Sequence, residues 1–415
     1  MDVERAIEDA LLAAPPHITE LYVGFSGGLD STVLLYALHR AWSSTQRAIH
    51  PVHIHHGLSS QADQWGQHCA EFASALGLSL QLIHVTAQPI KKESPEATAR
   101  RARYDAFRNL ISANSLLILG HHANDQAETV LLQLFRGAGI KGLAAMPVLT
   151  TFSEGYLARP FLSLSREQLE AYAQQHHLTW VEDESNACVD FDRNYLRHHI
   201  LPLVTTRWLG ALHCLSRSAH HCGEAQELLD ELAEQDIAQA SSESNAALNV
   251  LALKSLSPIR LNNALRYWFH KQGLPLPSTA KLQTLIQTVL CSRYDSSPRV
   301  TWPGAEVRRF RHELYAMRPL TPHDPSWQYL WDLKEDLILP SDLGVLRVND
   351  YEALAQGESL TIAFRQGGEL IQLPGRKGHH CLKKLMQEWH IPPWLRNRIP
   401  LIFRAEKLIS IRGYA

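Results

Sequence analysis

Six consecutive residues near the N-terminus carry the clearest chemistry in the chain, Ser26-Gly27-Gly28-Leu29-Asp30-Ser31. The two glycines let the backbone turn sharply and come close to a ligand. The two hydroxyls, with the free amides at the start of a following helix, can hold phosphate oxygens. Asp30 would repel a phosphate unless a divalent cation lay between them, because hard cations take oxygen ligands. The six residues therefore predict a phosphate site in which Asp30 is the metal ligand.

The elements around this stretch position it as a phosphate site requires. Residues 21–25 are predicted to form a buried strand, and residues 32–41 a helix with an apolar stripe. No lysine follows the glycines as in a Walker loop, and the GxGxxG pattern is absent. The stretch instead resembles the loop of the N-type ATP pyrophosphatases, which cleave ATP between the α and β phosphates and adenylate a carbonyl oxygen. That resemblance implies ATP and Mg²⁺ as cofactors. A turn that only joins strand to helix is the alternative.

Strands and helices alternate beyond the loop. Strands are expected at 48–55, 78–85, 116–119 and 156–161, with helices between them. This alternation predicts an α/β fold with a doubly wound parallel sheet. Ligands of such sheets bind beyond the carboxyl ends of the strands, where helix N-termini meet.

The helix expected at 93–113 changes character along its length. Tyr104, Phe107 and Ile111 share one face, which should pack on the sheet. Nearer its N-terminus the same face carries charges, at Glu96, Arg100 and Arg103. Charges on a packing face are costly unless they are paired or contact a ligand. We therefore expect these three side chains to line the cleft. The alternative is a Glu–Arg network that only stabilises the fold.

A second polar stretch, Gly120 to Thr129, follows the strand at 116–119 and opens another helix. Asp125 and Glu128 fall on one face of its first turn. They can cap the helix, since carboxylates are favoured at a helix N-terminus. They can also bind a metal or a substrate ammonium, or accept a proton from an amine. His121 and His122 are not spaced as a zinc pair, and one of them is a candidate ligand contact.

Composition limits the possible classes of protein. The chain has 415 residues, enough for two or three domains, and 45% of them are hydrophobic. No apolar run reaches 18 residues, so no membrane span is predicted. The six cysteines form no CxxC pair, which favours reduced thiols in a cytoplasmic protein.

The net charge of −2 hides a basic C-terminus. Residues 361–415 hold ten Lys or Arg against three Glu, an excess of seven positive charges. Such a segment on a mildly acidic body predicts that an anionic polymer binds there. Basic residues close to tryptophan suit phosphate contacts and base stacking, and the candidates are Arg376, Lys377, Lys383, Lys384, Trp394 and Arg396. The alternative for Trp389 and Trp394 is a place in the core.

A series of motifs in one order makes the resemblance more specific. The loop is followed by Glu-Ala-x-Ala-Arg-x-x-Arg-Tyr at 96–104, His-His-x-x-Asp-x-x-Glu-Thr at 121–129, Arg-Pro at 159–160, and Glu-Asp-Glu-Ser-Asn…Asp-Arg-Asn-x-Leu-Arg at 182–197. The series and the Pro-Pro-Trp-Leu-Arg of the tail resemble the tRNA(Ile)-lysidine synthase family over essentially the whole chain. One difference is Asn124-Asp125, where that family usually has two aspartates.

The resemblance implies a ligase. Members of the family use ATP and Mg²⁺ to adenylate the oxygen on carbon 2 of the wobble cytidine in an isoleucine tRNA with a CAU anticodon. Free L-lysine then displaces AMP to give lysidine, which changes the codon read from AUG to AUA. The catalytic residues implied here are Asp30, Arg103, Asp125 and Glu128. The implied substrate contacts are Glu96, Arg100, His122, Arg193, Asn194 and Arg197.

Three domains are expected: an ATP-binding domain at 1–210, a mainly helical substrate domain at 211–320, and a small α+β tRNA-binding domain at 327–415. A tRNA 2-thiolation enzyme is the runner-up, although thiolation commonly needs a CxxC pair. An amide synthetase and a non-catalytic tRNA-binding protein are less consistent with the residues. The sequence leaves open the oligomeric state, with a homodimer as one option, and the orientation of the domains. It also leaves open the rejection of methionine tRNA, the arginine that contacts the adenylate and the effect of Asn124.

Overall fold

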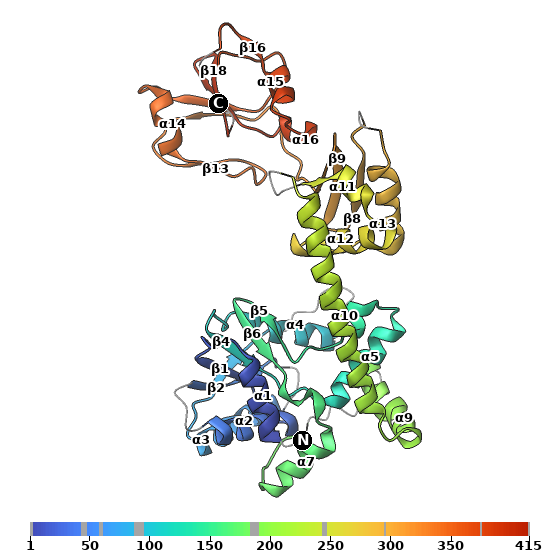
Figure 1. Cartoon of the computed structure of the whole chain (residues 1–415). Helices are drawn as coiled ribbons and strands as arrows, with labels where there is room; N and C mark the ends of the chain where they lie inside the picture. Colours follow the sequence, from blue (N-terminus) through green and yellow to red (C-terminus); the bar gives the residue numbers. More distant parts are fainter. Residues whose placement is uncertain are drawn as a thin grey trace. The chain divides into compact units, whose positions relative to one another are not determined.

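The computed structural model describes residues 3–42, 48–57, 61–86, 95–182, 191–242, 247–293, 296–373 and 376–413. The chain divides into two compact units, Met1–Leu228 and Leu229–Ala415, and each is described by itself (Figure 1). Within the described residues, no helix combines the length and the apolar character needed to cross a membrane.

The first unit is built on a six-stranded sheet of order β3-β2-β1-β4-β6-β5. Its strands are β1 (Glu20–Gly24), β2 (Ala48–His55), β3 (Gln81–His84), β4 (Ser115–Ile118), β5 (Leu149–Phe152) and β6 (Gly155–Ala158). All neighbours pair in parallel except β5 and β6, which form an antiparallel hairpin. The predicted doubly wound parallel sheet is confirmed. The antiparallel edge strand β5 is an addition that the sequence analysis missed.

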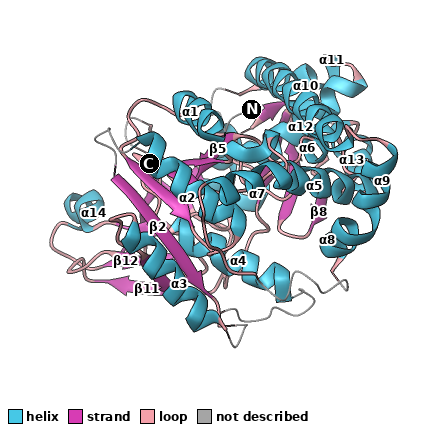
Figure 2. Cartoon of the chain, turned by 90° about the horizontal axis from the view of Figure 1, so that it is seen from below, coloured by secondary structure: helices cyan, strands magenta, loops and turns pink. Residues whose placement is uncertain are grey.

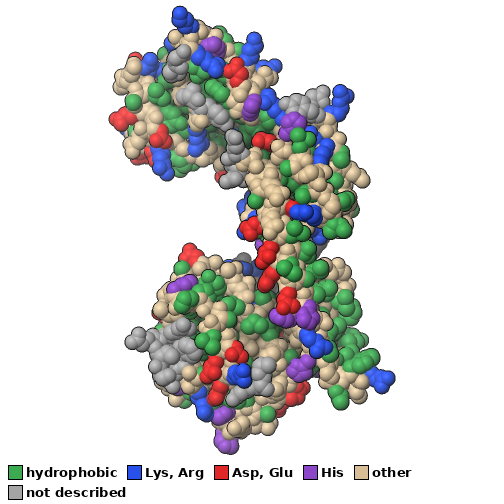
Figure 3. Space-filling model, viewed as in Figure 1, with side chains coloured by type: hydrophobic (Ala, Val, Ile, Leu, Met, Phe, Trp, Pro, Cys, Tyr) green, Lys and Arg blue, Asp and Glu red, His purple; other side chains and the backbone are tan. Residues whose placement is uncertain are grey.

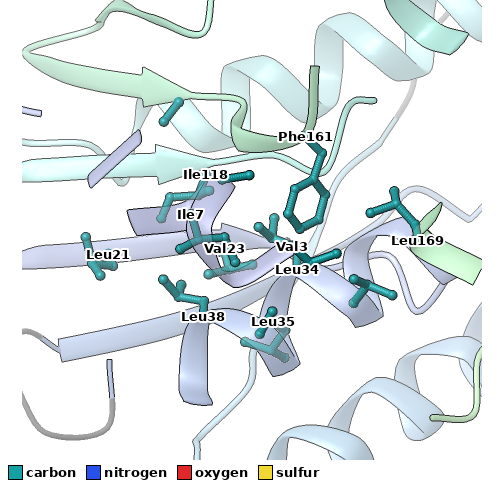
Figure 4. Close-up of a cluster of buried hydrophobic side chains, with 14 of the residues drawn as sticks. Val3, Ile7, Leu21, Val23, Leu34, Leu35, Leu38, Ile118, Phe161 and Leu169 are labelled. Atoms are coloured by element: carbon teal, nitrogen blue, oxygen red, sulfur yellow. The ribbon is translucent and has the colours of Figure 1, made fainter. Parts of the chain in front are cut away.

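Helices cover both faces of the sheet because its central strands are apolar on both sides. In β1, Leu21 and Val23 contact one cluster, which includes α1 (Val3–Ala13), α2 (Leu29–Trp42) and α7 (Arg166–Gln175) (Figure 4). Tyr22 faces the other cluster, in which Phe107 and Ile111 are buried next to α4 (Pro95–Arg108) or on it. The packing face expected for this helix is therefore the one observed.

The remaining elements of this unit follow the same alternation of strand and helix. Helix α3 (Ala62–Ala75) lies beside the long strand β2, and α5 (Ala123–Phe135) follows β4 (Figure 2). The chain continues through α6 (Ile140–Leu143) and the short 3-10 helix η1 (Pro160–Ser163). It then passes through α8 (Asp192–Tyr195), the π-helical turn η3 (Leu196–Ile200) and α9 (Leu201–Arg207).

The long helix α10 (Ala211–Ala240) leads into the second unit. Helices α11 (Val250–Ser255), α12 (Pro258–Lys271) and α13 (Thr279–Leu285), with the π-helical turn η4 (Ile286–Leu290), pack on a sheet of order β7-β10-β9-β8. Its strands are β7 (Leu248–Asn249), β8 (Arg299–Trp302), β9 (Ala305–Phe310) and β10 (Glu313–Met317). Strand-like alternation was expected at 300–315, and the antiparallel strands β8 to β10 lie there.

The C-terminal part of the second unit is a small α+β module. Its four-stranded antiparallel sheet consists of β11 (Gln328–Trp331), β14 (Leu360–Ala363), β17 (Leu401–Arg404) and β18 (Lys407–Ile411). Two short hairpins add β12 (Leu337–Ile338) with β13 (Val345–Leu346), and β15 (Leu370–Ile371) with β16 (His380–Cys381). The helices are α14 (Val348–Ala355), α15 (Leu382–Glu388) and α16 (Pro393–Arg396).

Candidate active site

The loop between β1 and α2 has the shape of an anion cradle. The Ser31 hydroxyl lies 3.1 Å from that of Ser26 and donates to the Gly28 carbonyl at 3.0 Å. Gly27 has φ of +84°, a conformation that favours glycine. A Cβ there would lie 2.9 Å from the Cys69 Sγ, so the loop rests directly on that buried thiol. All six loop residues thus form one compact turn at the carboxyl end of β1.

The turn after β4 approaches this loop closely. A Cβ on Gly120 would lie 3.0 Å from the Asp30 carbonyl oxygen, so only glycine allows the two backbones to meet here. The next turn brings the His122 Nε2 to 3.6 Å from the Asp30 Oδ2 and 3.5 Å from the Asp125 Oδ2. The His122 Nδ1 accepts the Asn124 amide, which leaves the proton on Nε2, facing the two carboxylates. The two polar stretches therefore meet at His122.

Asp125 and Glu128 have partners far along the chain. Arg197 donates Nε to the Glu128 Oε1 at 2.7 Å and Nη2 to the Asp125 Oδ1 at 3.2 Å. Arg193 lies 3.3 Å from the Glu128 Oε2 and also donates to the Thr129 hydroxyl. Asp125 accepts the His122 amide as well, so it caps α5 and pairs with a cation at the same time. We call Asp125, Glu128, Arg193 and Arg197 the paired cluster.

The net pKa shifts of the two acids have opposite directions, although burial raises the pKa of both. Glu128 is fully buried, and burial raises its pKa even though Arg197 opposes the shift. Burial would also raise the pKa of Asp125, but His122, His121 and Arg197 together lower it below the usual value. Asp125 is thus held as a carboxylate, while Glu128 depends on its arginines to stay ionised.

A magnesium ion fits this corner. The Asp30 Oδ1 is buried and has no hydrogen-bond partner, although it lies at the cradle. Among the described residues, no group of three or more His, Cys, Asp or Glu side chains is arranged to hold a metal. Mg²⁺ is typically held by one or two carboxylates together with substrate phosphates rather than by a full protein cage. Asp30 is the residue that would hold it here.

The other predicted substrate and catalytic residues differ in burial and in their neighbours. The guanidinium of Arg100 lies 5.2 Å from the centre of the Tyr104 ring. Arg103 lies exposed on α4. Asn194 is buried in α8. Glu96 lies in the first turn of α4, but its side chain is outside the described residues, as are residues 183–190 of the acidic motif.

Sequence reasoning missed two features of this site. Arg159 is buried next to α4 and the β4–α5 turn, although the sequence offered it only as part of an Arg-Pro motif. The His53 Nδ1 lies 2.9 Å from the Phe25 carbonyl and 3.4 Å from the Cys69 Sγ, so both side chains support the loop from below. A signal for His53 existed, because it lies inside an apolar strand where a histidine needs a partner.

The predicted tRNA contacts lie in the C-terminal module. Arg376, Lys377, Lys383 and Lys384 are exposed, and the first of them pairs with Glu388; basic side chains are visible on this module in Figure 3. Trp394 is half-buried instead. The rings of Phe310 and Tyr315 meet it edge-on at 6.4 and 5.5 Å. Arg396 lies next to it, with its guanidinium 5.8 Å from the centre of the Phe310 ring.

This fold and this corner define the class of protein. A parallel sheet with a glycine-rich turn after its central strand is that of a PP-loop domain, and residues 2–204 match the family model described as "PP-loop domain". Residues 248–315 match the "TilS substrate binding domain", and residues 360–415 match the "TilS substrate C-terminal domain".

Curated relatives identify the family. A tRNA(Ile)-lysidine synthase of Coxiella burnetii is 41% identical over 94% of this chain and 88% of its own length. The synthase of Proteus mirabilis is 40% identical over 94% and 90%. The chain belongs to the tRNA(Ile)-lysidine synthase family. Among solved structures, a tRNA thiolase of Methanococcus maripaludis covers 53% of this chain and 77% of its own, at 16% identity and a TM-score of 0.46.

Proposed function

We propose that the corner formed by the Ser26–Ser31 loop, His122 and the paired cluster carries out the reaction of the family. The chain is an ATP-dependent ligase that forms lysidine on an isoleucine tRNA. Its substrates in this proposal are free L-lysine, ATP and the isoleucine tRNA with a CAU anticodon. The observation that carries the proposal is the meeting of Asp30 and Asp125 at one histidine, directly beyond the carboxyl ends of β1 and β4.

The loop activates the nucleotide. Its backbone amides and the Ser26 and Ser31 hydroxyls bind the phosphates of ATP. Mg²⁺, when bound at Asp30, neutralises charge on the leaving pyrophosphate. His122 holds Asp30 and Asp125 in place through its Nε2 proton. The oxygen on carbon 2 of cytidine is then the group to be adenylated.

The paired cluster serves the amine. The ε-amine of lysine must lose a proton to attack carbon 2, and a carboxylate next to it can accept that proton. Asp125 and Glu128 are the acids available for this role. Arg193 and Arg197 keep both acids ionised while the site is buried. Arg103, on α4, is the candidate for the developing phosphate charge in this proposal.

The C-terminal module binds the tRNA in this proposal. Arg376, Lys377, Lys383 and Lys384 are exposed and can reach phosphates, with Arg376 first leaving its surface pair with Glu388. Arg396 lies among aromatic rings, where a guanidinium can also contact a base. A cytoplasmic location fits the free cysteines of the described residues. A homodimer remains part of the proposal, to be tested by sedimentation.

The test is nucleoside analysis after incubation with labelled lysine, ATP, Mg²⁺ and the isoleucine tRNA. We expect labelled lysidine at the wobble cytidine and one AMP for each lysine incorporated. Asp30→Ala should lower the rate of AMP formation by about 10³-fold or more, because the charge on the pyrophosphate is no longer neutralised. Sulfur incorporation in place of lysine would favour thiolation instead, although no cysteine pair of the CxxC type is present.

A further inference from the structure

A second group of polar side chains includes His121, which directly precedes His122 in the chain. It consists of Arg100 and Tyr104 from α4, His121 from the turn after β4, and Arg159 directly after β6. The guanidinium charges of Arg159 and Arg100 both act on His121, and the Tyr104 hydroxyl acts on Arg159. We call these four residues the arginine pocket.

Among the described residues, the positive charge of this pocket is not balanced. Arg159 is only 7% exposed, and the partner of its Nη1 is a neutral carbonyl, that of Pro147, at 3.1 Å. Arg100 contacts the Tyr104 ring. Among the described side chains, no carboxylate lies within ion-pair distance of either arginine, whereas Arg193 and Arg197 are both matched by acids. A buried charge is costly unless it is paired.

The pocket also holds three buried polar atoms without hydrogen bonds: the Tyr104 hydroxyl, the His121 Nδ1 and the Arg159 Nε. The Tyr104 hydroxyl lies near enough to Arg159 to raise the pKa of that guanidinium, yet it makes no hydrogen bond of good geometry. Buried polar groups in native proteins almost always have partners, so three orphans in one place indicate a missing ligand. Two guanidinium groups require that ligand to be an anion.

His121 adds no charge to the pocket. Burial, with the nearby arginines Arg159 and Arg100, lowers the pKa of His121 far below its usual value. The ring is neutral at physiological pH and can take either role in a hydrogen bond through its unpartnered nitrogen.

We propose that Arg159, together with Arg100 and Tyr104, binds the α-carboxylate of free lysine. This inference rests on the proposed function, in which lysine is the amine substrate. Lysine carries one carboxylate, and a guanidinium matches a carboxylate with two parallel hydrogen bonds. The other arginines near the site, Arg193 and Arg197, are occupied by Glu128 and Asp125. The ATP phosphates have their own cradle at Ser26–Ser31.

The position of the pocket agrees with this role. His121 precedes His122, so the arginine pocket and the paired cluster lie side by side, and charges from both act on His121. Lysine bound with its carboxylate at Arg159 therefore has the acids Asp125 and Glu128 near its amines. Recognition of both ends explains how a free amino acid can be selected over a simple diamine.

The experiment compares lysine with lysinamide, which keeps both amines but replaces the carboxylate with a neutral amide. We expect the wild-type chain to prefer lysine. Arg159→Gln should raise the KM for lysine about 10- to 100-fold, the effect of losing a charge-assisted hydrogen-bond pair. Its kcat/KM for lysinamide should stay at the wild-type value, so the preference collapses. Arg108→Gln is the matched control, because Arg108 lies exposed on α4, the helix that carries Arg100, and pairs with Asp105.

Two further variants guard against a folding defect. Arg159→Lys keeps the charge without the forked geometry and should recover part of the preference. Arg100→Gln changes a less buried residue of the same pocket and should lower the preference without affecting the fold, as checked by thermal melting. An unchanged ratio of lysine to lysinamide in folded Arg159→Gln and Arg100→Gln would overturn the proposal, as would a wild-type chain that uses both amines equally.

The α-phosphate of the adenylate is the other oxyanion that this pocket can accept. A raised KM for ATP, with an unchanged KM for lysine, would assign the pocket to that phosphate and contradict the carboxylate assignment. If the wild-type chain released AMP but attached neither lysine nor lysinamide to the tRNA, the proposed function itself would be contradicted.

Discussion

The paired cluster and the arginine pocket both lie near the His121–His122 turn, but they differ in charge balance. In the paired cluster, two arginines meet two acids, and the fully buried Glu128 has hydrogen bonds to both of its oxygens. In the arginine pocket, Arg159 is nearly as buried, but its Nη1 donates to the Pro147 carbonyl and no described acid pairs with it.

This difference separates two uses of a buried charge. A balanced cluster is complete without a ligand, so it can hold side chains in a fixed geometry for catalysis. An unbalanced cluster contains a buried charge without a partner, which is costly until a ligand of opposite charge binds. In our proposal, the balanced side of this site carries the proton chemistry, and the unbalanced side recognises the substrate.

The largest expected effect comes from breaking the balanced side. Arg197→Met removes both hydrogen bonds to Glu128 and leaves that carboxylate buried. We expect the free energy of unfolding of the first unit to fall by about 3–5 kcal/mol, the usual cost of removing one partner of a buried pair. Urea denaturation followed by circular dichroism measures this. Arg207→Met, at an exposed arginine of α9, should stay within about 0.5 kcal/mol of wild type. An equal loss in both variants would contradict the pairing argument.

Substitutions in the C-terminal module should change tRNA affinity alone. Lys383→Ala combined with Lys384→Ala removes two exposed cations of α15. The slope of log affinity for tRNA against log salt should become shallower by about one to two. The KM for lysine should not change. Filter binding at several salt concentrations gives the slope, with Lys334→Ala, which disrupts the surface pair with Asp332, as control. A slope that does not change would remove these lysines from the tRNA contact.

The smallest effect is expected when the unbalanced side is neutralised. Arg159→Met loses one hydrogen bond to a carbonyl and also removes an unpaired buried charge. The two effects oppose each other, so we expect stability to stay within about 1 kcal/mol of wild type. The same urea titration decides this. A loss as large as that of Arg197→Met would mean that Arg159 is already satisfied within the fold.

Local patterns in the sequence were enough to predict the nucleotide loop and its elements. The glycines, hydroxyls and Asp30 are contiguous, and β2 spans residues 48–55 as expected. The face of α4 that buries Phe107 followed from helical spacing alone. These features depend on residues that are close in sequence, so the spacing of apolar and polar residues is enough to predict them.

Pairing between distant segments could not be predicted in this way. Arg197 meets Glu128 across 69 positions, and no spacing rule connects them. Arg159 became a candidate ligand contact only when the structure showed that no described carboxylate forms an ion pair with it. Trp394 meets Phe310 and Tyr315 from another part of the chain, so the sequence left its role open between core packing and base stacking.

The proposed separation between ATP activation at Asp30 and lysine recognition at Arg159 can be tested by measuring pyrophosphate release and lysine incorporation in the same variants. The wild-type chain, Asp30→Ala and Arg159→Gln would each receive ATP and the isoleucine tRNA, first without lysine and then with a low concentration of it. The account predicts that Arg159→Gln releases pyrophosphate at the wild-type rate but incorporates little lysine, whereas Asp30→Ala does neither. Loss of pyrophosphate release in Arg159→Gln, to the level of Asp30→Ala, would contradict it.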